Sequence, residues 1–316
     1  MAEDMRFYDF DFNLLYILPA YTVDSGYISI NAQQDLNDSG SFEALVCDAE
    51  LKSIVQENKD CIMVVWNGFQ GFITSFKKEG KQLRLLGMHL NGLLHRAVIP
   101  KTVTDLSGDA ETLARAAVTA NIPWLVLGDT KGFENSVTYS TSKYLEADTY
   151  IQDLLVLDGA GYRIRADLPS KRFIFECIKP RKNPLVLSAD NLNAYNFQTT
   201  YTNKELSFGG WYEDESTKEW VYVSLDSSKE GIYKIDTVLS AKTASEAMNE
   251  LKKRKAEYVL EMKTKDISCG VDYNIGDIVR VQEDGVTKTQ LVSGVMSWQE
   301  RGYGEQPILT DYEEAI

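Results

Sequence analysis

The feature that most constrains the fold of this chain is a recurrence of short β-type segments between turn residues. One stretch with apolar residues at helical spacing interrupts it. Between residues 6 and 100, segments rich in β-branched and aromatic residues lie at 27–31, 42–47, 61–66, 71–77 and 82–88. Short strands at this close spacing are typical of an all-β sandwich or barrel. The sequence therefore predicts a first β-barrel domain over residues 1–104, with a solvated hairpin tip at 77–82.

The residue pattern changes from strand-like to mixed helix and strand over residues 105–180. The stretch SGDAETLARAAVTANI offers Ser107 or Asp109 as a helix N-cap, followed by apolar positions at helical spacing. A second helix is expected across 142–157, and Gly159 and Gly161 after it can adopt the left-handed conformation that ends a helix. Two alternating segments around a turn at 169–170 then indicate a hairpin. This stretch predicts a small α+β module.

Alternation of the β type returns from residue 181. One helix interrupts it, because Thr243 and Glu246 match a capping box and apolar positions continue at helical spacing to Met262. The basic run 252–255 lies on this expected helix, where it fits a solvated face, with an anionic partner as the alternative. Residues 181–316 are thus expected to form a second β-barrel domain with one helix near 243–262. Two β domains around an insert indicate a mainly β fold with a duplicated framework.

Composition narrows the class of function. The chain has 316 residues, 44% of them hydrophobic, with a formal net charge of −14 and a pI of about 4.7. This acidity is the reverse of the Lys and Arg excess that a free-standing nucleic-acid binder needs. The N-terminus carries no basic segment, and Pro19 interrupts the short apolar run 12–21. We therefore expect neither a signal peptide nor a membrane span.

The four cysteines are far apart and form no CxxC pair: Cys47, Cys61, Cys177 and Cys269. Each lies in an apolar or strand-like context, which favours buried free thiols over disulfides or metal ligands. Free thiols are in keeping with folding in a reducing cytoplasm.

Residues that could carry chemistry are few. His89 and His95 are six positions apart with no cysteine or third histidine nearby, so structural histidines are favoured over zinc ligands. The HExxH, GxSxG, P-loop and GxGxxG motifs are absent. We accordingly expect no enzyme activity, no catalytic residue, no cofactor and no metal.

Carboxylate pairs and aromatic residues leave a carbohydrate-active enzyme open as an alternative. The candidate pairs are Asp48 with Glu50 and Glu213 with Asp214, the second in an expected hairpin tip where water holds pKa values near normal. Four aromatic residues could stack on sugars, although in strands such residues are more often core or interface anchors: Trp211, Tyr212, Trp220 and Trp298.

The stretch VDYNIGDIVRV at 271–281 is expected to form a strand, a tight turn and a second strand. Its pattern Tyr273-x-x-Gly276-Asp277-x-Val279 resembles the closing YxxGDxV turn of the siphophage and prophage tail baseplate-hub family, also called Tal-like or tail-associated proteins. The turn chemistry fits, because glycine accepts a positive φ and aspartate can bond the local backbone.

Pieces of the N-terminal region resemble the same family. SGSFEALV at 39–46 is similar to its Gly-Ser-Phe-Glu strand entry, carried here by Gly40 and Phe42, and Gly71 opens a segment similar to its central strand. The segment LLGMHLNGLLHRAVI is similar to its Gly-x-x-Leu-x-x-x-Leu-x-Arg pattern, with the matching residues Gly87, Leu90, Leu94 and Arg96. Residues 105–240 resemble the family only in their general residue pattern and carry no motif of it.

The resemblance implies a hub fold in which two tube-like β-barrel domains flank smaller α/β modules. Three copies would form a homotrimer with pseudo-sixfold symmetry that contacts the tail tube, the distal tail protein and a fibre or receptor-binding protein, and that lets DNA pass. The location implied is the virion tail, assembled in the host cytoplasm. Hubs of phage-like injection systems share this fold and remain an alternative.

One departure concerns the end of the sequence. Tal-like proteins often carry a long C-terminal fibre or wall-degrading part, whereas this sequence ends at Ile316, soon after the second expected β domain. Such a part is expected to be absent, to lie on another protein, or to lie outside this sequence.

Overall fold

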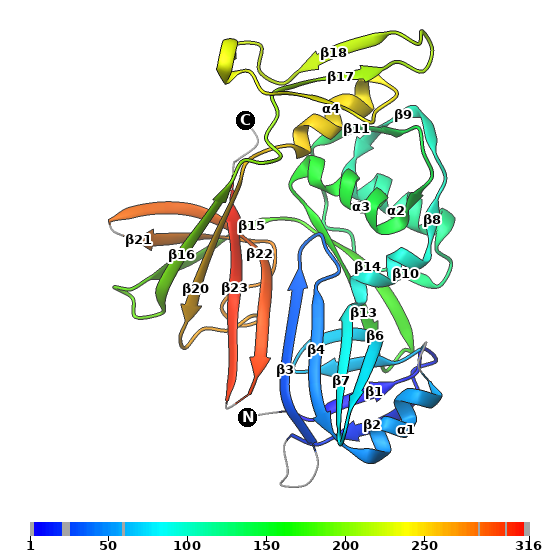
Figure 1. Cartoon of the computed structure of the whole chain (residues 1–316), viewed down its shortest axis with the longest axis vertical. Coiled ribbons are helices and arrows are strands. Elements are labelled where there is room, and N and C mark those ends of the chain that lie inside the picture. The colour runs from blue at the N-terminus through cyan, green and yellow to red at the C-terminus, as the bar shows by residue number, and fades with distance from the viewer. Residues whose placement is uncertain (1–2, 21–25, 59–60, 284, 301, 313–316) are drawn as a thin grey trace.

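The structure is a computed structural model that describes residues 3–20, 26–58, 61–283, 285–300 and 302–312. Its dominant feature is one 13-stranded sheet in which strands from both ends of the chain are hydrogen-bonded side by side. Figure 1 shows this arrangement, with the blue strands of the N-terminal part next to the red and orange strands of the C-terminal part. The molecule has four parts: an N-terminal half, a middle module, a C-terminal half and an arm.

The N-terminal half contains strands β1–β7, helix α1 and the 3₁₀ helix η1. The bounds are β1 Met5–Tyr8, β2 Leu14–Leu18, β3 Gly26–Asp35, β4 Ser41–Cys47, α1 Ala49–Glu57, β5 Met63–Trp66, β6 Phe69–Glu79, β7 Gln82–His89 and η1 Leu90–Arg96. Side chains alternate between buried and exposed along β4, so one face of the sheet builds a core with α1. Strands β3–β7 match the segments expected, whereas β1, β2 and the helix α1, capped by Asp48, were not singled out.

The middle module covers the end of this core with helices. Its elements are β8 Val98–Ile99, β9 Thr102–Asp109, α2 Ala110–Asn121, β10 Leu125–Leu127, β11 Ser136–Thr141, β12 Leu145–Glu146, α3 Ala147–Leu155, η2 Val156–Asp158, β13 Gly161–Asp167 and β14 Arg172–Ile178. The hairpin and the first helix are confirmed, since β13 pairs with β14 and Asp109 caps α2. The second helix begins at Ala147 and not at residue 142, because Leu145–Glu146 form β12, and Gly159 ends η2 with a φ of +61°. Its apolar side chains share one core with Leu90 and Leu94 of η1.

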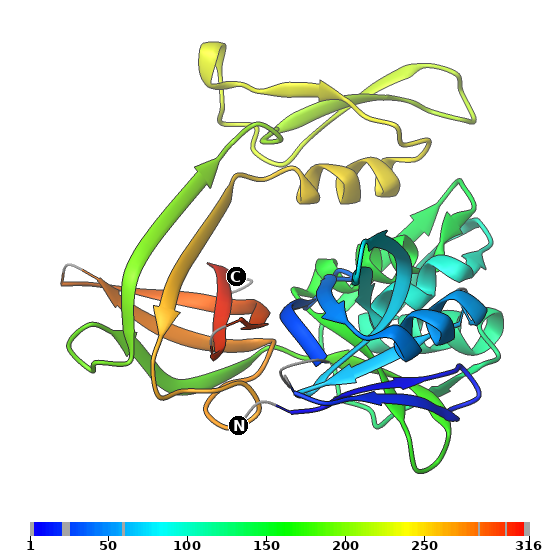
Figure 2. The ribbon, with the colours of Figure 1, turned by 60° about the horizontal axis from the view of Figure 1, so that its bottom comes forward.

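The C-terminal half completes the large sheet. It consists of β15 Arg181–Ser188, β16 Ala194–Thr202, β20 Glu257–Thr264, β21 Asp277–Glu283, β22 Val286–Gln299 and β23 Tyr303–Asp311. The last part, called the arm, leaves this half between β16 and β20 and contains β17 Gly209–Glu213, β18 Trp220–Ser224, η3 Gly231–Tyr233, β19 Asp236–Val238 and α4 Ala244–Lys253. Figure 2 shows the arm reaching from the C-terminal half across to the middle module.

The described strands contain no closed barrel, which departs from the two barrels expected. The sheet runs in the order β16-β20-β23-β22-β3-β4-β7-β6-β5-β1-β2, with β21 and β15 attached beside β22. The reason is the antiparallel pairing of β3 with β22, from Gly294 opposite Asp35 to Gln299 opposite Ile30. This pairing joins the two halves into one open sheet, with β2 and β16 at the two ends of the strand order and β15 as a third edge beside β21.

The helix expected over 243–262 is wrong in its second half. Thr243 caps α4 as predicted, but α4 ends at Lys253 and residues from Glu257 form β20. The positions Tyr258 and Met262 suit a helix and equally suit one face of a strand, since four residues are two strand repeats. Hydrogen bonding of β20 to β16 on one side and β23 on the other decides the conformation.

Two smaller expectations also change. Residues 271–276 form turns and a single bridge between Cys269 and Tyr273, so only the stretch after Gly276 is a strand. All four cysteines are free, as predicted, but only Cys177 is buried: Cys47 and Cys269 are half-buried and Cys61 is exposed. Within the described residues no helix combines the length and apolar character needed to cross a bilayer.

Candidate functional site: the clamp and the cleft beside the middle module

The turn after Tyr273 touches both the C-terminal half and the segment that leads out of the middle module. Gly276 has a φ of +90°, and its N–H donates to the Val292 carbonyl of β22 at 2.9 Å. Its own carbonyl accepts from the Arg181 N–H at 3.1 Å. A Cβ at position 276 would lie 2.5 Å from Cγ2 of Ile178. Glycine is therefore required twice here, by the backbone angle and by the close approach of β14.

Asp277 fixes the same turn from inside. Its side chain is 1% exposed, and Oδ1 accepts from Nε of Arg181 at 2.6 Å. The other oxygen, Oδ2, accepts from Nδ2 of Asn183 at 2.8 Å and from the Asn274 N–H at 2.9 Å. A buried carboxylate with every oxygen bonded is stable where an unpaired one would not be. We call Gly276, Asp277, Arg181 and Asn183 the clamp.

Tyr273 anchors the clamp to the last strand. It is buried, and its hydroxyl donates to Oε1 of Glu305 on β23 at 3.2 Å. The same carboxylate receives the N–H of Cys269. Burial, together with the charge of Glu305, raises the pKa of the Tyr273 hydroxyl, so that it remains a donor at neutral pH.

A cleft of about 550 Å³ lies beside the clamp, between the middle module and the C-terminal half. Four of its lining side chains are cationic and two are acidic: Lys131, Arg163, Lys179 and Arg181, with Glu176 and Asp277. Cys177 and Cys269 also line it. Burial raises the pKa of Cys177 to about 12 and that of Cys269 to about 11, so both thiols stay protonated and are weak nucleophiles.

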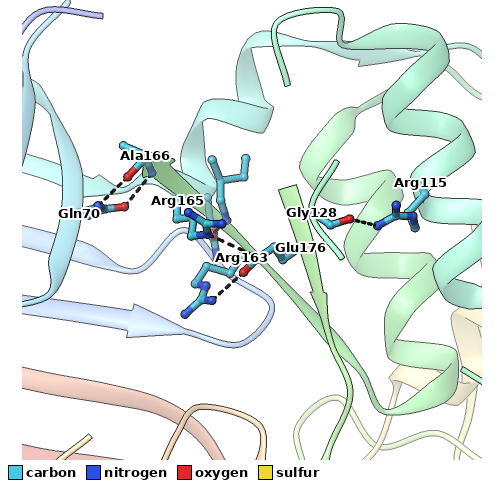
Figure 3. Close-up of polar contacts among 9 residues, drawn as sticks. Gln70, Arg115, Gly128, Arg163, Arg165, Ala166 and Glu176 are labelled. Atoms are coloured by element: carbon cyan, nitrogen blue, oxygen red, sulfur yellow. Dashed lines mark hydrogen bonds and ion pairs between the residues drawn. The ribbon is translucent and has the colours of Figure 1, made fainter. Parts of the chain in front are cut away.

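Glu176 organises the wall of the cleft formed by the middle module. Its carboxylate accepts from Nη2 of Arg163 at 2.6 Å and from Nε of Arg165 at 3.1 Å (Figure 3). Burial opposes ionisation, but the bonds and charges of the two arginines outweigh it and lower the pKa of Glu176. A Cβ on Gly128 would lie 2.6 Å from Cγ of Glu176, so glycine is needed there for the carboxylate to fit.

The module is also tied to the N-terminal half by side chains that bond main-chain groups. The amide of Gln70 on β6 bonds the backbone of Ala166 in both directions, at 2.7 Å and 3.0 Å (Figure 3). The buried Asn91 accepts from the Ile164 N–H at 2.8 Å and donates to the Asp38 carbonyl at 3.1 Å. These bonds fix the register of β13 against the larger sheet.

The N-terminal residues singled out by sequence lie together, away from the clamp. Phe42 on β4 is opposite Gly87 on β7, and its ring stacks on Phe69 with centroids 5.6 Å apart. A Cβ on Gly87 would meet the carbonyl of Phe72, and one on Gly71 would lie 2.5 Å from the carbonyl of Met88.

Gly40 and Arg96 complete this group at its two ends. Gly40 has a φ of +57°, and a Cβ there would run into the carbonyl of Gln33. Arg96 ends η1 with its guanidinium carbon 4.8 Å from the ring centre of Phe10 and 5.3 Å from that of Phe72. The structure thus separates the sequence motif into an N-terminal packing cluster and the C-terminal clamp.

The residues considered for chemistry have structural partners. Asp48 caps α1 by accepting from the Leu51 N–H at 2.8 Å and also accepts from the Tyr16 hydroxyl at 3.0 Å. Asp214 accepts from the backbone of Ser216 and Thr217 within its turn. Neither candidate carboxylate pair lines the cleft.

The two histidines differ in their surroundings. Burial and the charge of Arg163 lower the pKa of His89 to about 3, so it is neutral and accepts from the Asn91 N–H. Nδ1 of His95 lies 2.9 Å from Asp148 Oδ2 and 3.4 Å from Glu146 Oε2, and the three side chains could hold a cation. The same geometry is that of a histidine paired with the acids at the start of α3, and we assign it no metal.

Comparison with solved structures decides the fold. The tail protein from Neisseria meningitidis MC58 superposes with a TM-score of 0.61 at 14% identity, over 98% of this chain and 96% of that one. The 43 kDa tail protein of prophage MuSo2 from Shewanella oneidensis gives 0.60 at 11% identity, over 98% of each chain. Prophage tail protein gp18 from Listeria monocytogenes gives 0.55 at 13% identity, over 99% and 96%. This chain has the fold of prophage tail proteins. No protein-family model and no curated protein sequence matches it.

Within this tail-protein fold, sequence reasoning missed several of the residues that hold the parts together. Arg181, Asn183 and Glu305 gave no signal, because each acts on a partner distant in sequence. Glu176 could have been found. A single acid within the apolar strand FIFECI must meet a cation once the strand is buried.

Proposed function

We propose that this chain is a structural phage or prophage tail protein that forms a trimeric baseplate hub between the tail tube and the fibre or receptor-binding parts. The observation that carries the proposal is the likeness to tail proteins over nearly the whole length of both chains. The pairing of β3 with β22 supports it, because a component that transmits load between two assemblies needs rigidly joined halves. DNA passes through the hub on its way out of the particle.

The proposed domains are 1–104 and 181–316 as tube-like β domains and 105–180 as the module between them. Both outer domains supply antiparallel strands to the large sheet, which is what a duplicated framework requires. Superposition of residues 6–100 on residues 182–310 tests this division. Unrelated strand topologies in the two stretches would contradict the duplication.

The open edges of the sheet are the proposed contacts between copies. β2 carries the exposed side chains Leu14 and Ile17, and β16 carries the exposed Tyr195 and Tyr201. An unprotected edge with apolar residues favours pairing with another strand. Pairing of β2 in one copy with β16 in the next is a head-to-tail contact that closes a ring of three if the rotation per copy fits.

Electron microscopy of the purified chain at high concentration tests the ring. Threefold particles are expected for the wild type, and Ile17→Lys on β2 should abolish them because a charge on this edge opposes strand addition. Val286→Lys, at an equally exposed hairpin position, should leave them intact. Class averages without threefold symmetry would contradict the trimer.

The acidic surface fits a channel that DNA must leave without adhering. We propose that part of the net charge of −14 faces the lumen and that the basic run 252–255 faces away from it. Two of the four cations already have partners within the chain: Lys253 pairs with Asp153, and Arg254 with Glu250 at 3.2 Å. A reconstruction of the ring tests this placement of charge, since a neutral or basic lumen would contradict it.

The proposed role involves no catalysis. Zymography of the purified chain on cell-wall substrate is expected to show no clearing. A cleared zone that disappears on substitution of Glu213 or Asp48 would instead establish the carbohydrate-active alternative.

A further inference from the structure

An aromatic pocket opens on the surface where the N-terminal half meets the middle module, away from the clamp. Its volume is about 410 Å³, within the usual range of ligand pockets. The buried ring of Phe173 is its centre, with the centroids of Phe12, Phe10 and Trp124 at 4.8, 5.9 and 6.1 Å from it. Trp124 is 40% exposed, so the pocket wall is open to a partner.

The charges around this pocket are of one sign. Arg96, Lys171 and Arg172 line it, and no Asp or Glu is among its described lining residues. The chain as a whole has 47 acidic and 33 basic residues, so a pocket with Lys171 and Arg172 in its lining and no acid among its described lining residues is against the trend of the sequence. Asp11 lies between Phe10 and Phe12 in sequence but does not line the pocket.

The two turns that carry the pocket are held in an unusual conformation. Phe12 and Lys171 have positive φ values of 64° and 52°, although neither is glycine. Nζ of Lys171 donates to Oδ1 of Asn13 at 3.3 Å and so connects the β1–β2 turn with the β13–β14 turn. Such strain persists where the surroundings enforce it, and it is concentrated at binding sites.

We propose that this pocket binds a peptide segment of a partner protein in which an aromatic side chain is flanked by Asp or Glu. The aromatic anchor would enter among the rings of Phe10, Phe12 and Phe173, which favour edge and offset contacts. The flanking carboxylates would pair with Arg172 and Lys171 at the rim. Aromatic anchors that fill a pocket supply most of the binding energy at such interfaces, and the rim charges supply specificity.

The test uses the full chain and a fluorescently labelled probe peptide, acetyl-Glu-Glu-Phe-Glu-Glu-amide, with binding followed by anisotropy. Trp124→Ala and Arg172→Glu should each weaken binding about tenfold, as expected for contacts at an anchor site. The matched controls are Trp211→Ala, also at an exposed tryptophan, and Lys204→Glu, which should stay within about twofold. Peptides with Ala in place of Phe, or Lys in place of Glu, should not bind.

Several results would overturn the proposal. One is that the acidic Phe peptide does not bind, and another is that the peptide with Lys in place of Glu binds equally well. A third is that Trp211→Ala lowers the affinity as much as Trp124→Ala does. Sedimentation distinguishes a second copy of this chain as the occupant. If Trp124→Ala reduces self-association and leaves peptide binding unchanged, the pocket is a contact between copies. Because binding is measured on the isolated chain, the result is independent of whether the hub ring forms.

Discussion

The middle module is attached to the two sheet halves by different kinds of interaction. Toward the N-terminal half it shares an apolar core, in which Phe72, Leu90 and Leu94 pack with Ile151 and Leu154 of α3. Toward the C-terminal half its last strand, β14, leads directly into the clamp, where Arg181 and Asn183 on β15 bond the buried Asp277 of β21. We refer to the first attachment as the apolar junction.

The difference shows what each attachment can control. Burial of apolar area is non-directional, so the apolar junction supplies stability without fixing an angle by itself. Hydrogen bonds to a buried carboxylate require defined distances and angles, so the clamp supplies orientation. The clamp therefore fixes the direction in which the chain leaves the middle module, and the apolar junction supplies stability.

The largest expected effect is at the apolar junction. Leu94→Ala removes a fully buried side chain and should lower the free energy of unfolding by about 2–5 kcal/mol, from lost burial and the cavity left behind. Urea denaturation measures the change. Ile232→Ala, at a side chain that is 91% exposed, is the control and should change stability by less than about 0.5 kcal/mol. A small loss of stability in Leu94→Ala would mean that the neighbouring side chains repack to fill the cavity.

The next effect is at the clamp glycine. Gly276→Val should cost about 1–3 kcal/mol for a strained backbone, and more because the new side chain meets Ile178. Gly80→Val is the matched control, since Gly80 also has a positive φ but open space around it. The loss in melting temperature should be larger at 276 than at 80. Equal losses would show that the close approach of Ile178 is unimportant.

A smaller effect is expected for the charge of the clamp. Asp277→Asn keeps the shape of the side chain but turns an NH2 group toward a donor, so either the bond from Arg181 or the bond from the Asn274 N–H is lost. The lost charge pair with Arg181 contributes little, because that side chain is 67% exposed and screened by water. We expect a loss of about 1 kcal/mol by urea denaturation. Glu134→Gln, at an exposed acid 3.8 Å from Lys179, should be neutral. A neutral Asp277→Asn would show that shape alone orients the C-terminal half.

The smallest effect concerns pH at the cleft. The folded-state pKa of Glu176 lies below its ordinary value of 4.5, so its contribution to stability is complete above about pH 4.5 and is lost as pH falls through the folded pKa. The stability difference between wild type and Glu176→Gln should therefore shrink between about pH 6 and about pH 3. Urea midpoints across this interval measure it. A difference that grows on acidification would contradict the assigned ionisation.

Local patterns predicted local structure well. Asp109, Thr243, Gly159 and Gly80 each mark the helix start, helix end or hairpin tip expected from their sequence context, because caps and turns depend on a few adjacent residues. Among the failures are α1, which was missed, the strand expected before the turn at Gly276, and β20, which was expected as helix. In β20 the pairing with β16 and β23 overrode a spacing that two conformations share.

The sequence by itself determined the mainly β character, the interrupted middle, the acidic charge and the glycine-bearing turn at 276, since each depends on residue type and short-range spacing. Only the tertiary structure decided that β3 pairs with β22, that Arg181 meets Asp277 across 96 positions, and that Phe12 meets Phe173 in one pocket. The physical reason is that such partners are selected by how complete surfaces pack. The sequence around one residue of a distant pair does not indicate which residue it contacts.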